Sequence, residues 1–259
     1  MPHIARISLY PIKSLDGVDV KSASLLSSGA LKFDREFAIL DQQGKFVNGK
    51  RNPKVHLLRC QFHLDDRTVS LKLPGSNWQQ FHLDNEQNAL VATLSDFFGF
   101  PVTLQQNRSM GFPDDTDSLG PTIISTATLA EVASWFPEIT VDEMRRRIRA
   151  NIEIGDVPAF WEDQLFGEGD NIVTFRLGNV IVEGINPCQR CIVPTRNSLT
   201  GEGYSNFQKI FIDKRRETLP SWVAASRFNH FFRLSVNTKI SASEANKKLD
   251  TGSDVGVGV

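Results

Sequence analysis

The sequence has few cysteines, almost no excess charge and no long apolar run, and each absence narrows the kind of protein it can be. Three cysteines in 259 residues argue against a disulfide framework. A formal net charge of −1 provides no overall field toward nucleic acid or an anionic membrane. No apolar run is long enough to cross a bilayer, and residues 1–6 lack the basic and apolar pattern of a signal peptide. We therefore expect a protein of the reducing cytoplasm.

Apolar residues are nevertheless frequent enough for a sizeable core, because 40% of the chain is hydrophobic and 23% is charged. The first hundred residues predict short strands separated by turns, as in a small barrel or sandwich. A change to helical spacing of the apolar residues predicts one helix over residues 89–98. The clearest strand patterns lie at residues 5–10, 37–40, 46–47 and 69–73.

A polar stretch rich in glycine, proline and aspartate, residues 107–121, predicts a loop or a junction between two domains. Beyond it, the apolar spacing predicts both helices and short strands. We expect helices over residues 126–136, 140–147 and 206–217, the first of them capped by Thr126 or Thr128. We expect strands at residues 122–125, 148–154, 172–177, 180–183 and 232–236, and a terminal strand or a frayed tail at 252–259.

The most informative motif is Asn186-Pro187-Cys188-Gln189-Arg190-Cys191, which contains two of the three cysteines. The thiolate is the reactive and metal-binding form of cysteine, and an adjacent guanidinium favours it. A closed zinc site needs four ligands, which Cys60 and the scattered histidines do not supply at the usual spacing. A thioredoxin-like dithiol would open a helix, which Pro194 opposes. Two inert buried cysteines remain an alternative to our hypothesis that Cys191 is the reactive residue.

Basic residues give a second candidate site. A run of arginines near residue 147 is typical of the solvated face of a helix, and a nucleic-acid patch is an alternative. From Arg147 onward, polar and apolar residues alternate, which predicts a strand with Arg147, Arg149 and Asn151 on one face. Two guanidiniums and an amide suit a phosphate or a polar heterocycle. Two other polar segments have simple interpretations, a surface ion pair and a turn: Asp34-Arg35-Glu36 and Lys13-Ser14.

Taken together, these segments resemble the MOSC family, in which an N-terminal β-barrel precedes a MOSC domain. The resemblance extends over residues 3–257, and its order and spacing are more specific than any single motif. The segments that carry it are Tyr10-Pro11-Ile12-Lys13-Ser14-Leu15-Asp16-Gly17, Leu31-Lys32-Phe33-Asp34-Arg35-Glu36-Phe37, Ile123-Ile124-Ser125-Thr126-Ala127-Thr128-Leu129, Arg149-Ala150-Asn151-Ile152 and Pro187-Cys188-Gln189-Arg190-Cys191-Ile192. The family includes the mitochondrial amidoxime-reducing component and the C-terminal domain of molybdenum cofactor sulfurase. The resemblance implies a β-rich α+β fold, with a small barrel-like domain over residues 1–106 packed on a larger MOSC-type β-barrel domain over residues 107–259 with a few helices.

The resemblance also implies a molybdenum–pyranopterin cofactor and no need for pyridoxal phosphate. Cys191 matches the position of the thiolate that ligates the metal, whereas Cys188 matches a position where relatives often have cysteine. The cofactor phosphate would be held by cations and neutral donors of both segments, and other donors would lie near the pterin. The residues implied to bind the cofactor are Lys13, Ser14, Arg35, Ser125, Thr126, Arg149, Asn151, Gln189 and Arg190.

The function implied is two-electron reduction of small N-hydroxylated substrates. A separate electron-donor protein of ferredoxin or flavoprotein type would be needed, because the sequence shows no iron–sulfur or flavin motif. We expect no nucleic-acid or membrane partner. Two departures bear on the substrate: Ala150 replaces a proline, and the segment 196–201 replaces an acidic loop with one that carries an arginine. The alternative function is a non-catalytic carrier of the cofactor or of persulfide sulfur on Cys188 or Cys191.

Overall fold

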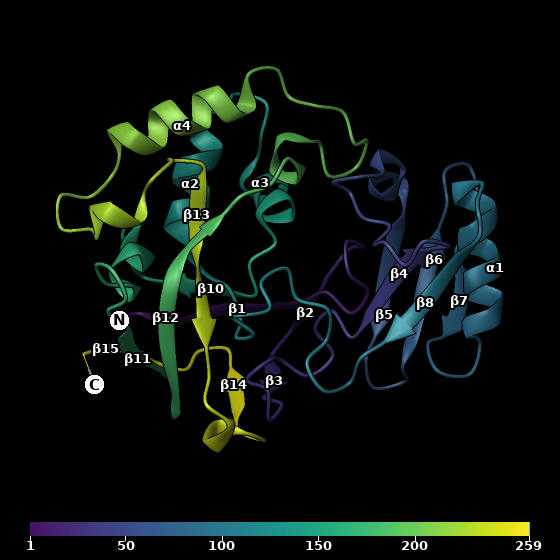
Figure 1. Ribbon diagram of the computed structural model, residues 1–259, viewed down its shortest axis with the longest axis horizontal. Coiled ribbons are helices and arrows are strands. Elements are labelled where there is room, and N and C mark those ends of the chain that lie inside the picture. The colour runs from purple at the N-terminus through teal and green to yellow at the C-terminus, as the bar shows by residue number, and fades with distance from the viewer. Residues whose placement is uncertain (259) are drawn as a thin grey trace.

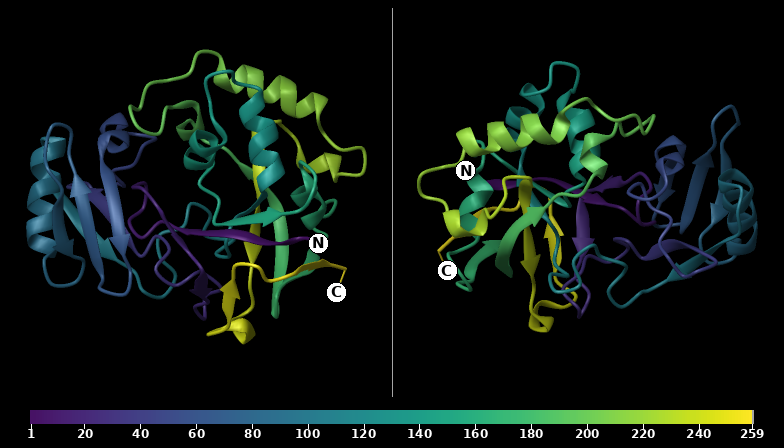
Figure 2. Two further views of the ribbon diagram at one scale, coloured as in Figure 1. Left: turned by 180° about the vertical axis from the view of Figure 1, so that it is seen from behind. Right: turned by 45° about the horizontal axis from the view of Figure 1, so that its top comes forward.

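A computed structural model describes residues 1–258 and contains one large mixed sheet, three small sheets and four α-helices in that range (Figure 1). The large sheet has eight strands, and only its β9–β10 pair is parallel. Its strands, in spatial order, are β15 (Val255–Val257), β11 (Val173–Leu177), β12 (Val180–Gln189), β13 (Arg233–Lys239), β9 (Ile123–Ser125), β10 (Ile152–Gly155), β1 (His3–Leu9) and β2 (Val18–Val20). The first strands of the chain therefore complete a sheet made mostly from its second half, and the two termini meet there (Figure 2).

The small sheets are formed mainly by the segment that follows β2. A two-stranded sheet, a three-stranded sheet and α1 lie together at the far end of the molecule from the chain termini (Figure 1). Their elements are β4 (Phe37–Asp41) with β8 (Val102–Gln106), β5 (Arg59–His63) with β6 (Thr68–Lys72) and β7 (Gln79–His82), and α1 (Gln87–Phe98); β3 (Ser22–Ser24) pairs separately with β14 (Lys248–Asp250). Helix α1 buries Leu90, Leu94 and Phe98, which are four residues apart and therefore share one face.

The other helices gather on one side of the large sheet (Figure 1). They are α2 (Thr126–Ser134), α3 (Val141–Ile148) and α4 (Phe207–Glu217), and they share one aromatic-rich core with the large sheet. Phe136 and Phe207 stack there with ring centroids 4.3 Å apart. The short 3₁₀ helices are η1 (Pro53–Leu57), η2 (Trp161–Leu165), η3 (Val193–Thr195), η4 (Ala225–Arg227) and η5 (Ala242–Glu244).

Three expectations about local structure need correction. The cap of α2 is Ser125, whose Oγ accepts a hydrogen bond from the Thr128 amide at 3.0 Å, and neither predicted threonine has this role. The predicted strand over residues 148–154 begins only at Ile152. Arg147 belongs to α3 and Arg149 caps that helix in the left-handed conformation, with φ 57°, so they do not share a strand face with Asn151.

The β-rich character is confirmed, but the expected barrels are not closed in residues 1–258. The large sheet is open, because its edge strands β15 and β2 each pair with one neighbour in the strand order. The three small sheets are separate ladders of two or three strands. The domain boundary after residue 106 stays a prediction.

Candidate functional site

A cleft of about 1440 Å³ contains most of the residues selected from the sequence. Its walls come from the turns after β1, the η1 region, the loop after β8, the end of α3 and the end of β12. The predicted residues that line it are Lys13, Ser14, Arg35, Arg149, Asn151, Gln189, Arg190 and Cys191. Segments that are distant in sequence therefore share one ligand-sized space.

Two predicted residues are not in this group. Ser125 is fully buried, and its hydroxyl is used by Thr128 beneath α2. The Thr126 hydroxyl contacts the carboxylate of Glu153 at 3.4 Å, and Thr126 does not line the cleft either. Their contacts support the start of α2, so we do not carry them into the proposed site.

The cleft is positive although the chain as a whole is not. Its lining includes more than twice as many lysine and arginine as aspartate side chains, and no glutamate. The formal net charge of the whole chain is −1. Because cations are concentrated in one concave space, that space attracts anions much more strongly than the average surface does.

Lys13 lies deep in this wall, with 7% of its surface exposed. Its ammonium group donates to the carbonyls of Phe112 and Pro113, at 2.9 and 3.2 Å, and pairs with Asp114. Burial lowers the pKa of Lys13, and Asp114 opposes that change. Lys13 is therefore a fixed cation held by the loop that follows β8.

Arg35 and Arg149 face the ring of Tyr10, with guanidinium carbons 5.2 and 4.0 Å from its centroid. Arg35 is paired with Asp34 and donates to the Asn151 side-chain oxygen at 3.3 Å. Among residues 1–258, the Arg149 side chain makes neither a hydrogen bond nor an ion pair. Burial lowers the pKa of Arg149, and Tyr10 opposes that change, although a guanidinium stays charged at neutral pH. Arg149 is thus a half-buried cation without an anionic partner in this part of the chain.

The backbone at this end of the cleft is strained. Ser14, Arg35 and Arg149 have φ angles of 74°, 49° and 57°, in the left-handed region that favours glycine. Such conformations cost free energy and concentrate at functional sites. All three were selected from the sequence as ligand-binding residues, and all three line the cleft.

The cysteine pair forms another part of the wall. Cys188 is the next-to-last residue of β12 and is half-buried, whereas Cys191 is exposed. The third cysteine, Cys60, is buried. Burial raises the pKa of the Cys60 thiol, which makes it the least reactive of the three. Within residues 1–258, no three His, Cys, Asp or Glu side chains gather as a metal site. A metal bound at Cys191 would therefore need ligands other than these side chains.

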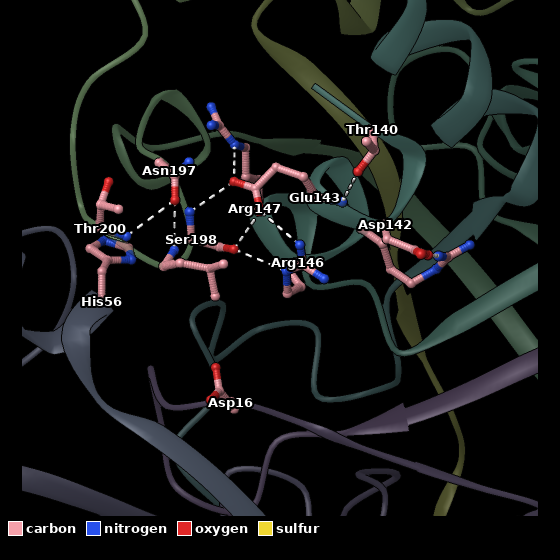
Figure 3. Close-up of polar contacts among 12 residues, drawn as sticks. Asp16, His56, Thr140, Asp142, Glu143, Arg146, Arg147, Asn197, Ser198 and Thr200 are labelled. Atoms are coloured by element: carbon pink, nitrogen blue, oxygen red, sulfur yellow. Dashed lines mark hydrogen bonds and ion pairs between the residues drawn. The ribbon is translucent and has the colours of Figure 1, made fainter. Parts of the chain in front are cut away.

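The loop after η3 is held against α3 by a carboxylate that sequence reasoning missed. Glu143 accepts hydrogen bonds from the Ser198 amide at 2.8 Å and the Ser198 hydroxyl at 2.6 Å, and from the Arg147 Nε at 2.7 Å (Figure 3). On the opposite side of the cleft, Arg59 donates to the Ser198 carbonyl at 3.2 Å. The Thr140-x-x-Glu143 spacing is a capping signal that predicts the start of α3, but it does not show where the carboxylate points.

These features define a β-rich protein with a cation-lined cleft that contains a cysteine pair. Residues 1–138, more than half of the chain, match the model of the MOSC N-terminal beta barrel domain. The chain belongs to this family.

Relatives agree with that assignment at low identity. The chain is 25% identical over 233 residues to the molybdenum cofactor sulfurase of Drosophila grimshawi, covering 78% of this chain and 29% of that protein. It is 25% identical over 240 residues to mitochondrial amidoxime reducing component 2 of Homo sapiens, covering 76% and 68%. It thus spans less than a third of that sulfurase. Among solved structures, the YUAD protein of Bacillus subtilis aligns over 99% of this chain and 96% of its own, with 9% identity and a TM-score of 0.39. None of the helices in residues 1–258 has the length and apolar character to cross a membrane.

Proposed function

We propose that the cleft binds a molybdenum–pyranopterin cofactor and that the protein reduces small N-hydroxylated compounds, with the Cys191 thiolate ligating the metal. The observation that carries the proposal is the half-buried guanidinium of Arg149, which lines the same cleft as Cys191 and has no hydrogen-bond or ion-pair partner among residues 1–258. Relatives named for the molybdenum cofactor and for amidoxime reduction support the same chemistry.

The residues present fit such a group. Lys13, Arg35 and Arg149 supply positive charge for a phosphate, and the Ser14 hydroxyl is a neutral donor beside them. The Asn151 amide already donates to the Ser8 carbonyl at 3.0 Å, which leaves one N–H for a ligand. A soft thiolate suits a thiophilic redox metal. A cleft of about 1440 Å³ also leaves room for a substrate beside a bound cofactor.

When bound, the cofactor would supply the two-electron redox chemistry that cleavage of an N–O bond requires. The protein positions the site. Arg190 is fixed because its backbone amide donates to the Phe232 carbonyl at 3.0 Å and its Nη2 donates to the Ile148 carbonyl at 2.5 Å. This anchoring holds the residue before Cys191 beside the start of β13 and the end of α3. Electrons would come from a separate ferredoxin- or flavoprotein-type donor.

The first test is elemental analysis for molybdenum, with fluorescence of the released oxidised pterin, on protein from a host that makes the cofactor. We expect both near one per chain in the unaltered protein. Cys191→Ser should abolish reduction of an N-hydroxylated base by an artificial electron donor, and Cys188→Ser is the matched control that should retain it. Equal activity in Cys191→Ser and the unaltered protein would refute the assigned ligand.

The second candidate is a carrier of the cofactor or of persulfide sulfur. The observation that favours it is that Cys188 and Cys191 both line the cleft and are both accessible there. Release of thiocyanate on treatment with cyanide, lost in Cys188→Ser, would favour the carrier over the reductase. Bound molybdenum with turnover and no thiocyanate would exclude it.

A further inference from the structure

The cleft contains another group of cations, of which only Arg190 was also selected from the sequence as a residue near the proposed cofactor. Arg190, Arg227 and Arg233 line it near Cys188. They come from the end of β12, from η4 and from the start of β13, so three separate segments deliver guanidiniums to one wall. We call these three residues the arginine row.

The arginine row is ordered along the end of β12. Arg227 donates to the Ile185 carbonyl at 2.7 Å, and Arg233 donates to the Pro187 carbonyl at 2.9 Å. Arg190 places its Nη1 3.3 Å from the Cys188 sulfur. The pairing of β12 with β13 shifts register twice over this stretch, between Gly184 and Asn186 and between Pro187 and Gln189. Such bulges interrupt the ladder and leave carbonyls for side-chain donors.

No carboxylate neutralises the row within residues 1–258. Every protein partner of the three guanidiniums is a carbonyl, an amide oxygen, a hydroxyl or the Cys188 sulfur. In contrast, several other cleft arginines have acidic partners: Arg6 pairs with Asp19, and Arg145 pairs with Glu153. The Nε atoms of Arg190 and Arg233 are also buried without a hydrogen-bond partner. Burial lowers the pKa of Arg233; Cys188 opposes that change, and the charge of Arg227 adds to it.

Arg227 and Arg233 are half-buried, and the charge of each makes the other less favourable. With Arg190 on the same wall and no acid beside them among residues 1–258, the arrangement favours binding of an anion. The planar guanidinium binds carboxylate and phosphate through paired hydrogen bonds. We propose that the arginine row is an anion subsite that binds the carboxylate or phosphate group of the substrate, separate from the Lys13, Arg35 and Arg149 group. This assignment rests on the proposed function, and it narrows the substrates to N-hydroxylated compounds that carry an anionic group.

The subsite can be tested on protein without cofactor, through the thiol of Cys188. Iodoacetate and iodoacetamide alkylate the same thiolate but differ in charge, so their rate ratio reports the local potential independently of the thiol pKa. Trypsin cleaves after Arg190, which places Cys188 and Cys191 in different peptides for mass spectrometry. We expect the iodoacetate-to-iodoacetamide ratio at Cys188 to exceed that of glutathione about tenfold, and to fall as salt is added.

Variants separate the subsite from general charge effects. Arg227→Gln with Arg233→Gln should bring the Cys188 ratio close to that of glutathione, whereas Arg233→Lys should keep most of the preference. Arg6→Gln removes the same charge from a cleft arginine that already has an acidic partner, so it should change the ratio little. A ratio equal to that of glutathione in the unaltered protein, or one that the double variant leaves unchanged, would overturn the subsite.

The substrate class is tested with benzamidoxime and 4-carboxybenzamidoxime, which differ by one carboxylate. The loaded protein should reduce the carboxylate compound with a kcat/KM about tenfold higher, the effect of one charge-assisted contact. The double variant should lose that preference while its kcat/KM for benzamidoxime stays within about twofold. Loss of molybdenum from the double variant would instead assign the row to the cofactor and overturn the proposal. Failure of the proposed function gives a different result, because the loaded protein would then reduce neither compound. The substrate assignment would then be overturned, whatever the alkylation ratio at Cys188.

Discussion

Glu143→Gln is the substitution with the most clearly defined expected cost. The buried carboxylate accepts from the Ser198 amide and hydroxyl and from the guanidiniums of Arg147 and Arg146, at 2.8, 2.6, 2.7 and 3.1 Å. A glutamine amide keeps one acceptor oxygen and turns an NH₂ group toward other donors. Breaking a buried ion pair costs about 3–5 kcal/mol, and the retained oxygen places our estimate near the lower value, about 3 kcal/mol. For a chain of this length, that corresponds to a melting temperature lower by about 6–12 °C.

The pH dependence gives a second check of the same contact. Burial alone would raise the pKa of Glu143, but its bonds to Ser198 and Arg147 hold it below the ordinary value. A carboxylate whose pKa is depressed by folding contributes stability that is present above its ordinary pKa and is lost as the pH falls through the folded-state pKa. The difference between the two proteins should therefore be largest near pH 7 and shrink below about pH 4.

Differential scanning calorimetry at pH 7 and at pH 3.5 measures both effects. Glu138→Gln is the matched control, because Glu138 is exposed and makes no hydrogen bond or ion pair among the described residues; its melting temperature should stay within about 1 °C. A double-mutant cycle with Ser198→Ala should give a coupling of about 1 kcal/mol or more. A Glu143→Gln protein with the same melting temperature as the unaltered protein at pH 7 would refute the reasoning.

Three other predictions follow from burial and backbone conformation. Arg149→Gly relieves a left-handed residue, so it should raise the free energy of unfolding by about 1 kcal/mol while cofactor content falls at least about tenfold; a loss of both would show that Arg149 is structural. Asp163→Ala leaves the fully buried Arg215 without its partner and should cost about 3–5 kcal/mol in a denaturant titration, whereas Arg215→Met with Asp163→Leu should recover most of it; an unaffected single variant would contradict the pairing. A colorimetric thiol assay at pH 8 should count two fast thiols in native protein and a third, Cys60, only after denaturation, because burial raises its pKa; three fast thiols would contradict that burial.

The elements predicted well are those whose pattern is local. The spacing of Leu90, Leu94 and Phe98 predicts α1, because residues four apart share one face of a helix whatever the rest of the chain does. The first half of the strand predicted over residues 148–154 is wrong for a physical reason, whereas its second half is confirmed by β10. A helix that ends at Ile148 and turns through a left-handed Arg149 gives the same alternation of apolar and charged residues as a strand. A short pattern cannot distinguish the two, since the choice depends on the cap.

In the candidate site too, local features could be predicted from the sequence and long-range ones could not. The Cys-x-x-Cys segment and the separate cations could be selected by residue type, but their meeting in one cleft depends on long-range topology. The arginine row could not be predicted, because Arg227 and Arg233 match no motif and gain significance only beside β12. Ser125 shows the opposite case: a helix-capping serine has the residue type of a ligand donor, and only its burial distinguishes the two roles.

The cleft arginines divide by partner, and that division connects structure to function. Arg6, Arg145 and Arg147 each pair with a carboxylate that offsets the charge, and Arg35 likewise pairs with Asp34. Arg149 and the arginine row have no such partner among residues 1–258, and neither has Arg196, whose guanidinium donates to the Gly201 carbonyl at 3.4 Å. A fold gains no stability from desolvating a cation that it leaves unpaired, and at Arg149 it also retains a strained backbone angle. Both costs are understandable if the charge is kept for a ligand. The unpaired cations therefore mark two anionic positions in the cleft, one for the proposed cofactor phosphate and one for the proposed substrate.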